Sequence, residues 1–285
     1  MPPKDPGVFQ KPAGTYDPRG RLDPIGFDRH VRFRTRLPCA PLRPFLDHFW
    51  VIGWDVSENG YHSVELMHRP YVDVFLSLDW SGVQGTFRGK RVYEAQGSGR
   101  IIGARFLPGA FGSFWSGELA NLQDQQLPLS ELFEGLDRAA VEQLLEHDDE
   151  VVMDRLEELL LLKKPAPDAN IALVNTIIAA IEADDTLSTV SAVANSFRYS
   201  ERWMQQLFRT YVGIGLKWFL QRHRLLLAAE RIRGSDAPDW AGMAYDLGYS
   251  SQQHFITDFR KVLGETPLQY RATALQRQST QTEWD

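Results

Sequence analysis

The fold of this chain is decided by residues 243–260, which have the sequence MAYDLGYSSQQHFITDFR. Ala244 is small enough to let two helices cross closely, and Gly248 suits the tight turn that follows. Ser250 can accept a hydrogen bond at the start of the next helix, and Gln253 three residues later completes a capping-box pattern. This stretch therefore predicts a helix-turn-helix unit.

A second copy of the pattern lies about 50 residues earlier, in residues 193–209, VANSFRYSERWMQQLFR. Ala194 and Ser200 align with the alanine and serine of the later copy, and the closing phenylalanines align after a shift of one residue. The apolar residues of the second helix in each copy are expected to face inward. They are Trp203, Leu207 and Phe208 in the first copy and Phe255 and Phe259 in the second. One copy alone could be a helical hairpin without further function, but two matched copies favour a DNA-binding domain.

The outward faces of these two helices carry side chains suited to contacts with double-stranded DNA. Arginine can hydrogen-bond guanine and glutamine can hydrogen-bond adenine in the major groove, whereas cations on the flanks hold phosphates. We assign phosphate contacts to Arg209, Arg260 and Lys261. The full predicted DNA-binding set is Arg202, Gln205, Gln206, Arg209, Gln252, Gln253, His254, Thr257, Arg260 and Lys261.

The tandem arrangement resembles the DNA-binding domain of the AraC/XylS family of bacterial transcription regulators. The resemblance covers roughly residues 171–272 and is most specific in the second unit, through Phe259-Arg260-Lys261, Gly264-Glu265-Thr266-Pro267 and Tyr270-Arg271. It implies that recognition helices Ser200–Tyr211 and Ser251–Val262 enter adjacent major-groove segments of a promoter.

The first unit departs from this pattern by carrying Arg198 where the second has Gly248. A turn position with positive φ is costlier for arginine than for glycine. We therefore expect the first unit to sit differently or to contribute less to sequence recognition.

The amino-terminal half has the pattern of a small β-barrel or sandwich. Residues 31–37 alternate in hydrophobicity with period two, and residues 49–52, 72–76 and 101–102 are rich in β-branched and aromatic residues. The overall prediction is an α+β fold, in which a β-rich sensor domain precedes an all-α domain with two helix-turn-helix motifs.

The domain boundaries follow from changes in composition. Six prolines and four glycines in residues 1–28 predict a flexible arm, and Pro165 and Pro167 interrupt any helix near them. The predicted order is an arm at 1–28, the sensor domain at 29–126, an acidic helical dimerisation segment at 127–163, a linker at 164–170, the tandem helix-turn-helix domain at 171–276 and a tail at 277–285.

Residues 103–109 and 127–133 resemble a sensor-type domain found in some family members, whose ligand is generally undefined. Aromatic walls and one charge, as an effector pocket needs, are available from Trp50, Trp54, Tyr71, Arg105 and Trp115. The alternative is that these aromatics form the core of the barrel. The alternating Arg32, Arg34 and Arg36 could hold an anion or extend the DNA contact, but a solvated strand face is the favoured interpretation.

The net charge of −6 argues, taken alone, against a nucleic-acid partner. The charge is unevenly distributed, however: residues 118–185 carry a net −13, and residues 186–275 carry a net +4. Local charge governs phosphate contact, so the basic carboxy-terminal segment keeps DNA as the expected partner.

No catalytic, metal or cofactor site is expected. The only cysteine is Cys39, and the spacing of His62, Glu65 and His68 fits no standard metal-ligand pattern. Without a signal peptide or a membrane-spanning run, we expect a cytoplasmic protein that binds promoter DNA and an effector as a homodimer. Two alternatives stay open: a small-molecule-binding barrel enzyme with a structural helical domain, and a ligand-independent dimeric regulator.

Overall fold

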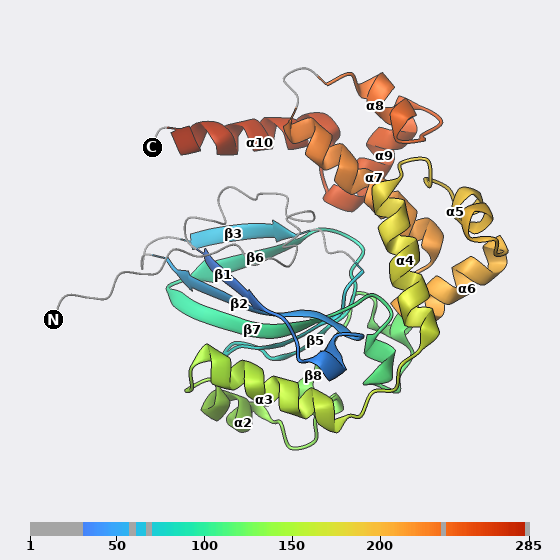
Figure 1. Cartoon of the computed structure of the whole chain (residues 1–285). Coiled ribbons are helices and arrows are strands. Elements are labelled where there is room, and N and C mark those ends of the chain that lie inside the picture. Colours follow the sequence, from blue (N-terminus) through green and yellow to red (C-terminus); the bar gives the residue numbers. More distant parts are fainter. Residues whose placement is uncertain (1–30, 57–60, 67–69, 235–237, 283–285) are drawn as a thin grey trace.

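A computed structural model of the chain describes residues 31–56, 61–66, 70–234 and 238–282. A sheet-rich amino-terminal part is followed by a helical carboxy-terminal part (Figure 1), which confirms the predicted α+β fold class. The predicted arm at 1–28 lies outside the described residues. No described helix is long and apolar enough to cross a membrane.

The amino-terminal part contains a six-stranded antiparallel sheet in the order β1-β2-β7-β4-β5-β8. Its strands are β1 (Val31–Arg36), β2 (Leu46–Asp55), β4 (Asp73–Leu76), β5 (Gly82–Gln84), β7 (Ser98–Phe106) and β8 (Gln126–Pro128). A separate antiparallel pair, β3 (Tyr61–Leu66) and β6 (Arg91–Gln96), lies on one side of this sheet (Figure 1). The described residues of this part also form the 3-10 helices η1 (Ala40–Leu42), η2 (Phe111–Ser113), η3 (Leu119–Leu122) and η4 (Leu129–Glu131).

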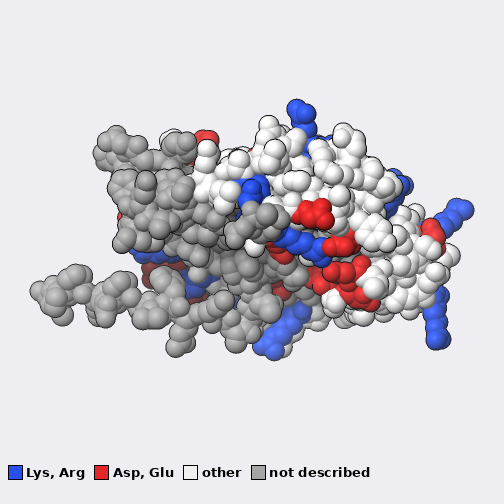
Figure 2. All heavy atoms as spheres, turned by 90° about the horizontal axis from the view of Figure 1, so that it is seen from above, with Lys and Arg blue, Asp and Glu red and all other residues white. Residues whose placement is uncertain are grey.

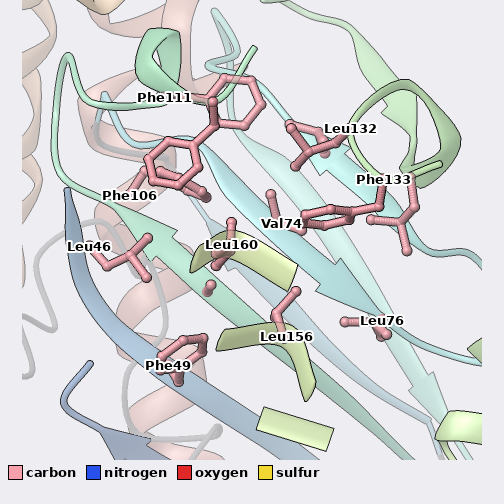
Figure 3. Packing of buried hydrophobic residues seen from close by; sticks show 14 of the residues in the cluster. Leu46, Phe49, Val74, Leu76, Phe106, Phe111, Leu132, Phe133, Leu156 and Leu160 are labelled. Carbon is pink, nitrogen blue, oxygen red and sulfur yellow. The ribbon is translucent and has the colours of Figure 1, made fainter. Parts of the chain in front are cut away.

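The opposite face of the sheet is covered by α2 (Arg138–Leu144) and α3 (Asp149–Leu162) (Figure 1). Because successive strand residues point to opposite faces, each strand contributes every second side chain to this core. Figure 3 shows the packing, in which α3 inserts Leu156 and Leu160 against strand residues. The labelled strand residues of the cluster are Leu46, Phe49, Val74, Leu76 and Phe106.

The acidic α3 lies against arginines of the sheet. Arg34 Nη2 is 2.8 Å from Asp149 Oδ2, and Arg36 pairs with Glu150, Asp154 and Glu157 on the same helix. The arginine face is therefore only partly solvated, because β1 lies beside the acidic helix: the Arg34 side chain is 44% exposed and the Arg36 side chain 25% exposed. Part of the negative charge of the central segment is balanced inside its own domain.

Within the described residues, the carboxy-terminal part has seven helices in two packed groups. They are α4 (Ala169–Ala183), α5 (Val190–Phe197), α6 (Glu201–Val212), α7 (Leu216–Arg233), α8 (Trp240–Asp246), α9 (Gln252–Leu263) and α10 (Pro267–Thr282). The long α7 contributes its first half to one apolar core and its second half to the other. Helix α10 continues beyond residue 276 into the predicted tail.

Candidate nucleic-acid interface

The pairs α5–α6 and α8–α9 form two helix-turn-helix units with matching turns. In the first unit the Tyr199 N–H donates to the Ala194 carbonyl at 3.0 Å, and in the second the Tyr249 N–H donates to the Ala244 carbonyl at 2.9 Å. The residue before each tyrosine has positive φ, 59° at Arg198 and 73° at Gly248. The arginine therefore adopts the turn conformation that glycine favours, and the two units have the same backbone conformation at this position.

We expect Arg198→Gly to raise the free energy of unfolding by about 1 kcal/mol, because a side chain in the left-handed region costs roughly 1–2 kcal/mol and Arg198 adopts that region. Urea unfolding followed by circular dichroism measures the change. Gly248→Ala is the matched control and should destabilise the chain by a similar amount. An unchanged or lower stability of Arg198→Gly would show that the arginine makes a compensating contact.

Each recognition helix begins at a serine that caps it. Ser200 Oγ accepts from the Trp203 N–H at 3.2 Å, and Ser251 Oγ accepts from the His254 N–H at 3.2 Å. The prediction that Ser250 caps the second helix is wrong, since its hydroxyl lies instead 3.3 Å from His254 Nδ1. The second turn is one residue longer, so Ser251 has the extended backbone and the position that the cap requires.

With these caps aligned, the two recognition helices match residue for residue. Phe208 and Phe259 coincide without any shift, and both are fully buried. Their neighbours Arg209 and Arg260 also coincide and are exposed. The one-residue offset in the sequence comparison therefore comes from the turn and not from the helices.

One inward-facing prediction is wrong. Trp203 is 37% exposed and stacks on Tyr199, with ring centroids 4.0 Å apart and planes 12° from parallel. The buried stripe of α6 runs through Met204, Leu207 and Phe208. On a helix with about 100° between residues, position 203 falls outside this stripe, so its ring finds an aromatic partner at the turn.

The predicted DNA-binding residues lie on the outer faces of both helices. Nine of them are exposed: Arg202, Gln206, Arg209, Gln252, Gln253, His254, Thr257, Arg260 and Lys261. The tenth, Gln205, is half-buried. Acidic side chains lie among the basic ones on the face shown in Figure 2, without a broad basic patch.

Two residues of α7, Arg224 and Gln221, hold the second unit in place. Arg224 Nη1 donates to the Gly248 carbonyl at 3.3 Å, and its guanidinium lies 4.8 Å from the Tyr249 ring centre. Gln221 Nε2 donates to Asp258 Oδ2 at 2.7 Å, which ties α7 to α9. Burial raises the pKa of Tyr249 to about 12. Sequence reasoning missed these contacts because the partners lie more than 20 residues apart.

The predicted effector-site residues divide into two groups. Asp73 is 3% exposed, and its carboxylate accepts from Arg105 Nε at 2.9 Å and Nη2 at 3.0 Å and from Trp50 Nε1 at 3.4 Å. The Arg105 guanidinium lies 5.1 Å from the Tyr71 ring centre. Burial lowers the pKa of Arg105, but the charge and hydrogen bonds of Asp73, together with Tyr71 and Asp47, outweigh burial and raise the pKa overall. Three predicted residues therefore meet around an aspartate that the sequence did not single out.

The other two predicted residues lie elsewhere. Trp115 packs against the core on the α3 side of the sheet, with its ring 6.0 Å from Phe111. Trp54 packs near Val31 at the far end of β2, and its Nε1 donates to the Gln96 carbonyl at 3.1 Å. Trp54 and Trp115 are therefore not part of the group formed by Asp73, Arg105, Trp50 and Tyr71, which we call the Asp73 cluster.

Comparison with known proteins assigns the two parts of the chain separately. Residues 193–273 match a helix-turn-helix domain family, and residues 34–128 match a domain of unknown function (DUF6597). The chain is 36% identical over 100 residues to the regulatory protein SoxS of Salmonella typhimurium. This match covers 35% of this chain and 92% of SoxS. It is 34% identical over 83 residues to a putative AraC-like transcription regulator of Streptomyces antibioticus, across 29% of this chain and 27% of that protein.

The chain belongs to the AraC/XylS family. It is a DNA-binding transcription regulator. Among solved structures, this AraC/XylS regulator is similar to the carboxy-terminal domain of AraT, a response regulator from Geobacillus stearothermophilus. The identity is 28%, the match covers 35% of this chain and 84% of that one, and the TM-score is 0.33.

Proposed function

We propose that this regulator contacts promoter DNA with both recognition helices, α6 and α9, and has no catalytic role. The observation that carries the proposal is the match between the two helices. Each is capped by serine, anchored by buried phenylalanine (Phe208 in α6, Phe255 and Phe259 in α9) and exposed along a face of arginine and glutamine side chains. Side chains of this chemistry suit base edges and phosphates in the major groove. We propose a cytoplasmic protein, since that is where bacterial promoter DNA would be met.

The test begins with selection of bound duplexes from a random pool, followed by affinity measurement at several salt concentrations. We expect Arg202→Ala and Gln253→Ala each to lower affinity for the selected site roughly 5- to 150-fold, since one good base contact is worth about 1–3 kcal/mol. Affinity of the wild type should fall as salt rises.

The matched control is Arg138→Ala, which removes an exposed arginine paired with Glu142 on α2, away from both recognition helices. It should leave affinity unchanged. Failure of the wild type to select any sequence, or binding indifferent to salt, would contradict the proposal. If only Gln253→Ala weakens binding, the first unit contributes less to sequence recognition than the second.

We also propose that the Asp73 cluster binds the effector. In the strand register, Arg105 on β7 is opposite Asp73 on β4, Asp73 is opposite Gln84 on β5, and Gln84 is opposite Gln126 on β8. These four residues therefore form one row, or rung, across the four strands. Gln84 Oε1 accepts from Gln126 Nε2 at 2.6 Å and from Arg91 Nη1 at 3.2 Å. Polar groups beside Trp50 and Tyr71 suit a small ligand with both polar and apolar surface. Thermal shift of the full chain against a metabolite panel tests this, and no stabilising compound would favour the ligand-independent alternative.

We propose that two copies associate through α3. Its exposed side carries Val151, Arg155, Glu158 and Leu162, and Arg155 Nη1 is 3.0 Å from Glu158 Oε2 within one copy. An antiparallel pair would set Val151 against Leu162 and Arg155 against Glu158. Sedimentation should show a dimer that Leu162→Glu weakens and that Leu78→Glu, at a comparably exposed leucine of the sheet domain, leaves intact. A monomeric wild type would contradict the proposal.

A further inference from the structure

The carboxy-terminal end of each recognition helix rests on the amino-terminal domain. Helix α6 ends at Gly213, where φ is 80° and a Cβ atom would lie 2.5 Å from the Leu119 carbonyl oxygen in η3. Only glycine allows this close approach of two backbones. At the end of α9, the Lys90 N–H donates to the Val262 carbonyl at 3.2 Å. Carbonyls in the last turn of a helix lack partners within the helix, so Lys90 supplies one from another domain.

The Lys90 side chain strengthens the second of these contacts. Its Nζ lies 3.2 Å from Glu65 Oε1 on β3 and 3.4 Å from Glu265 Oε1, just beyond α9. All three side chains are less than a quarter exposed. A cation beside a helix carboxy terminus also interacts favourably with the helix dipole. Lys90 therefore bonds α9 through its backbone and the segment just after α9 through its side chain.

Helix α7 is bonded to the loop that contains Lys90, residues 85–90 between β5 and β6. Arg222 is 4% exposed, and its Nη1 donates to the Arg88 carbonyl at 2.9 Å. Its guanidinium contacts two rings, 5.0 Å from the Trp218 ring centre and 5.9 Å from that of Phe87. Burial lowers the pKa of Arg222 to about 9. Burial of a guanidinium costs free energy, which the hydrogen bond to Arg88 and the contacts with the two rings offset.

The segments of the sheet domain that contact α6 and α9, which contain Leu119 and Lys90, are joined to each other by hydrogen bonds. The Arg88 N–H donates to Asp124 Oδ1 at 2.8 Å, and the Asp124 N–H donates to the Thr86 carbonyl at 2.7 Å. The Gly85 N–H donates to the Gln125 carbonyl at 3.3 Å. We call this piece, residues 85–90 together with 119–125, the bracket. It directly follows Gln84, which shares a strand rung with Asp73.

We propose that the bracket sets the spacing and angle between α6 and α9, with Lys90 and Glu265 as positioning residues for α9. This inference rests on the proposal that both helices contact DNA. A rigid support under both helix ends holds one arrangement and so selects one spacing of the two DNA segments. The bracket directly follows β5. A shift in the position of Gln84 would therefore move the bracket and, with it, both recognition helices. In this way a change in the sheet would alter DNA binding.

The experiment compares the selected DNA site with the same site carrying one extra base pair between its two contacted segments. One base pair moves the second segment by about 3.4 Å and turns it by about 34°. We expect the wild type to bind the lengthened site at least about tenfold more weakly, since roughly 1.4 kcal/mol of lost contact suffices. Lys90→Met and Glu265→Gln should reduce this ratio to less than about threefold. Lys90→Arg should restore it, and Arg138→Met should leave it unchanged.

Hydrogen exchange gives an independent readout. Binding of the selected DNA site should slow amide exchange in residues 85–90 of the wild type, and this protection should be lost in Lys90→Met. An unchanged spacing ratio in both Lys90→Met and Glu265→Gln, with no protection of the loop, would overturn the bracket proposal. A wild type that selects no DNA site would instead contradict DNA contact by the two helices, so the two failures are distinguishable. Circular dichroism confirms that each variant is folded.

Discussion

Asp73→Asn lowers the free energy of unfolding by about 3 kcal/mol, an expected result of removing one partner from a buried ion pair, which typically costs about 3–5 kcal/mol. The asparagine keeps the shape of the side chain but leaves the Arg105 charge without its bidentate carboxylate. Arg105 is 27% exposed at its side chain, so water compensates part of the loss and the low end of the range applies. Urea unfolding at neutral pH measures the difference.

The control for this prediction is Glu142→Gln, which breaks the exposed pair with Arg138. That change should cost less than about 1 kcal/mol, since exposed ion pairs contribute little. Equal effects of the two variants would show that Asp73 does not hold Arg105 in a desolvated site. If a stabilising effector is found by thermal shift, Asp73→Asn should also abolish the shift that it produces.

Phe259→Ala should lower the free energy of unfolding by about 3–5 kcal/mol, because truncating a buried phenylalanine loses its burial and leaves a cavity. Phe259 is fully buried, with its ring centre 5.6 Å from that of Phe255 and 5.7 Å from that of Tyr270. These three rings join α9 to α10. Specific DNA affinity should fall with stability, because Arg260 and Thr257 depend on the same anchor.

Leu268→Ala is the matched control, since this residue of α10 is 64% exposed. It should change stability by no more than about 0.5 kcal/mol. Phe208→Ala should repeat the large effect in the first unit, where the Phe208 ring centre lies 5.7 Å from that of Phe219. A loss of less than about 1 kcal/mol in Phe259→Ala would show that the second unit is not held by this ring cluster.

Local chemistry explains why the helix-turn-helix units could be predicted. Ala194, Ser200 and Phe208 act within one turn and one helix, so their spacing is visible in the chain. The two errors in these units are also local. Ser251 rather than Ser250 caps α9 because the turn is one residue longer, and Trp203 is exposed because it lies just beside the buried stripe.

The sequence by itself determined the fold class, the tandem units and the outward faces that carry the predicted DNA-binding residues, because helical periodicity and capping are properties of neighbouring residues. Only the tertiary structure placed Asp73 beside Arg105, Arg34 beside Asp149 and Lys90 beside Val262. Such pairs depend on strand register and on the packing of one domain against another. Spacing along the chain does not encode these arrangements, because the partners are brought together by burial of apolar surface elsewhere.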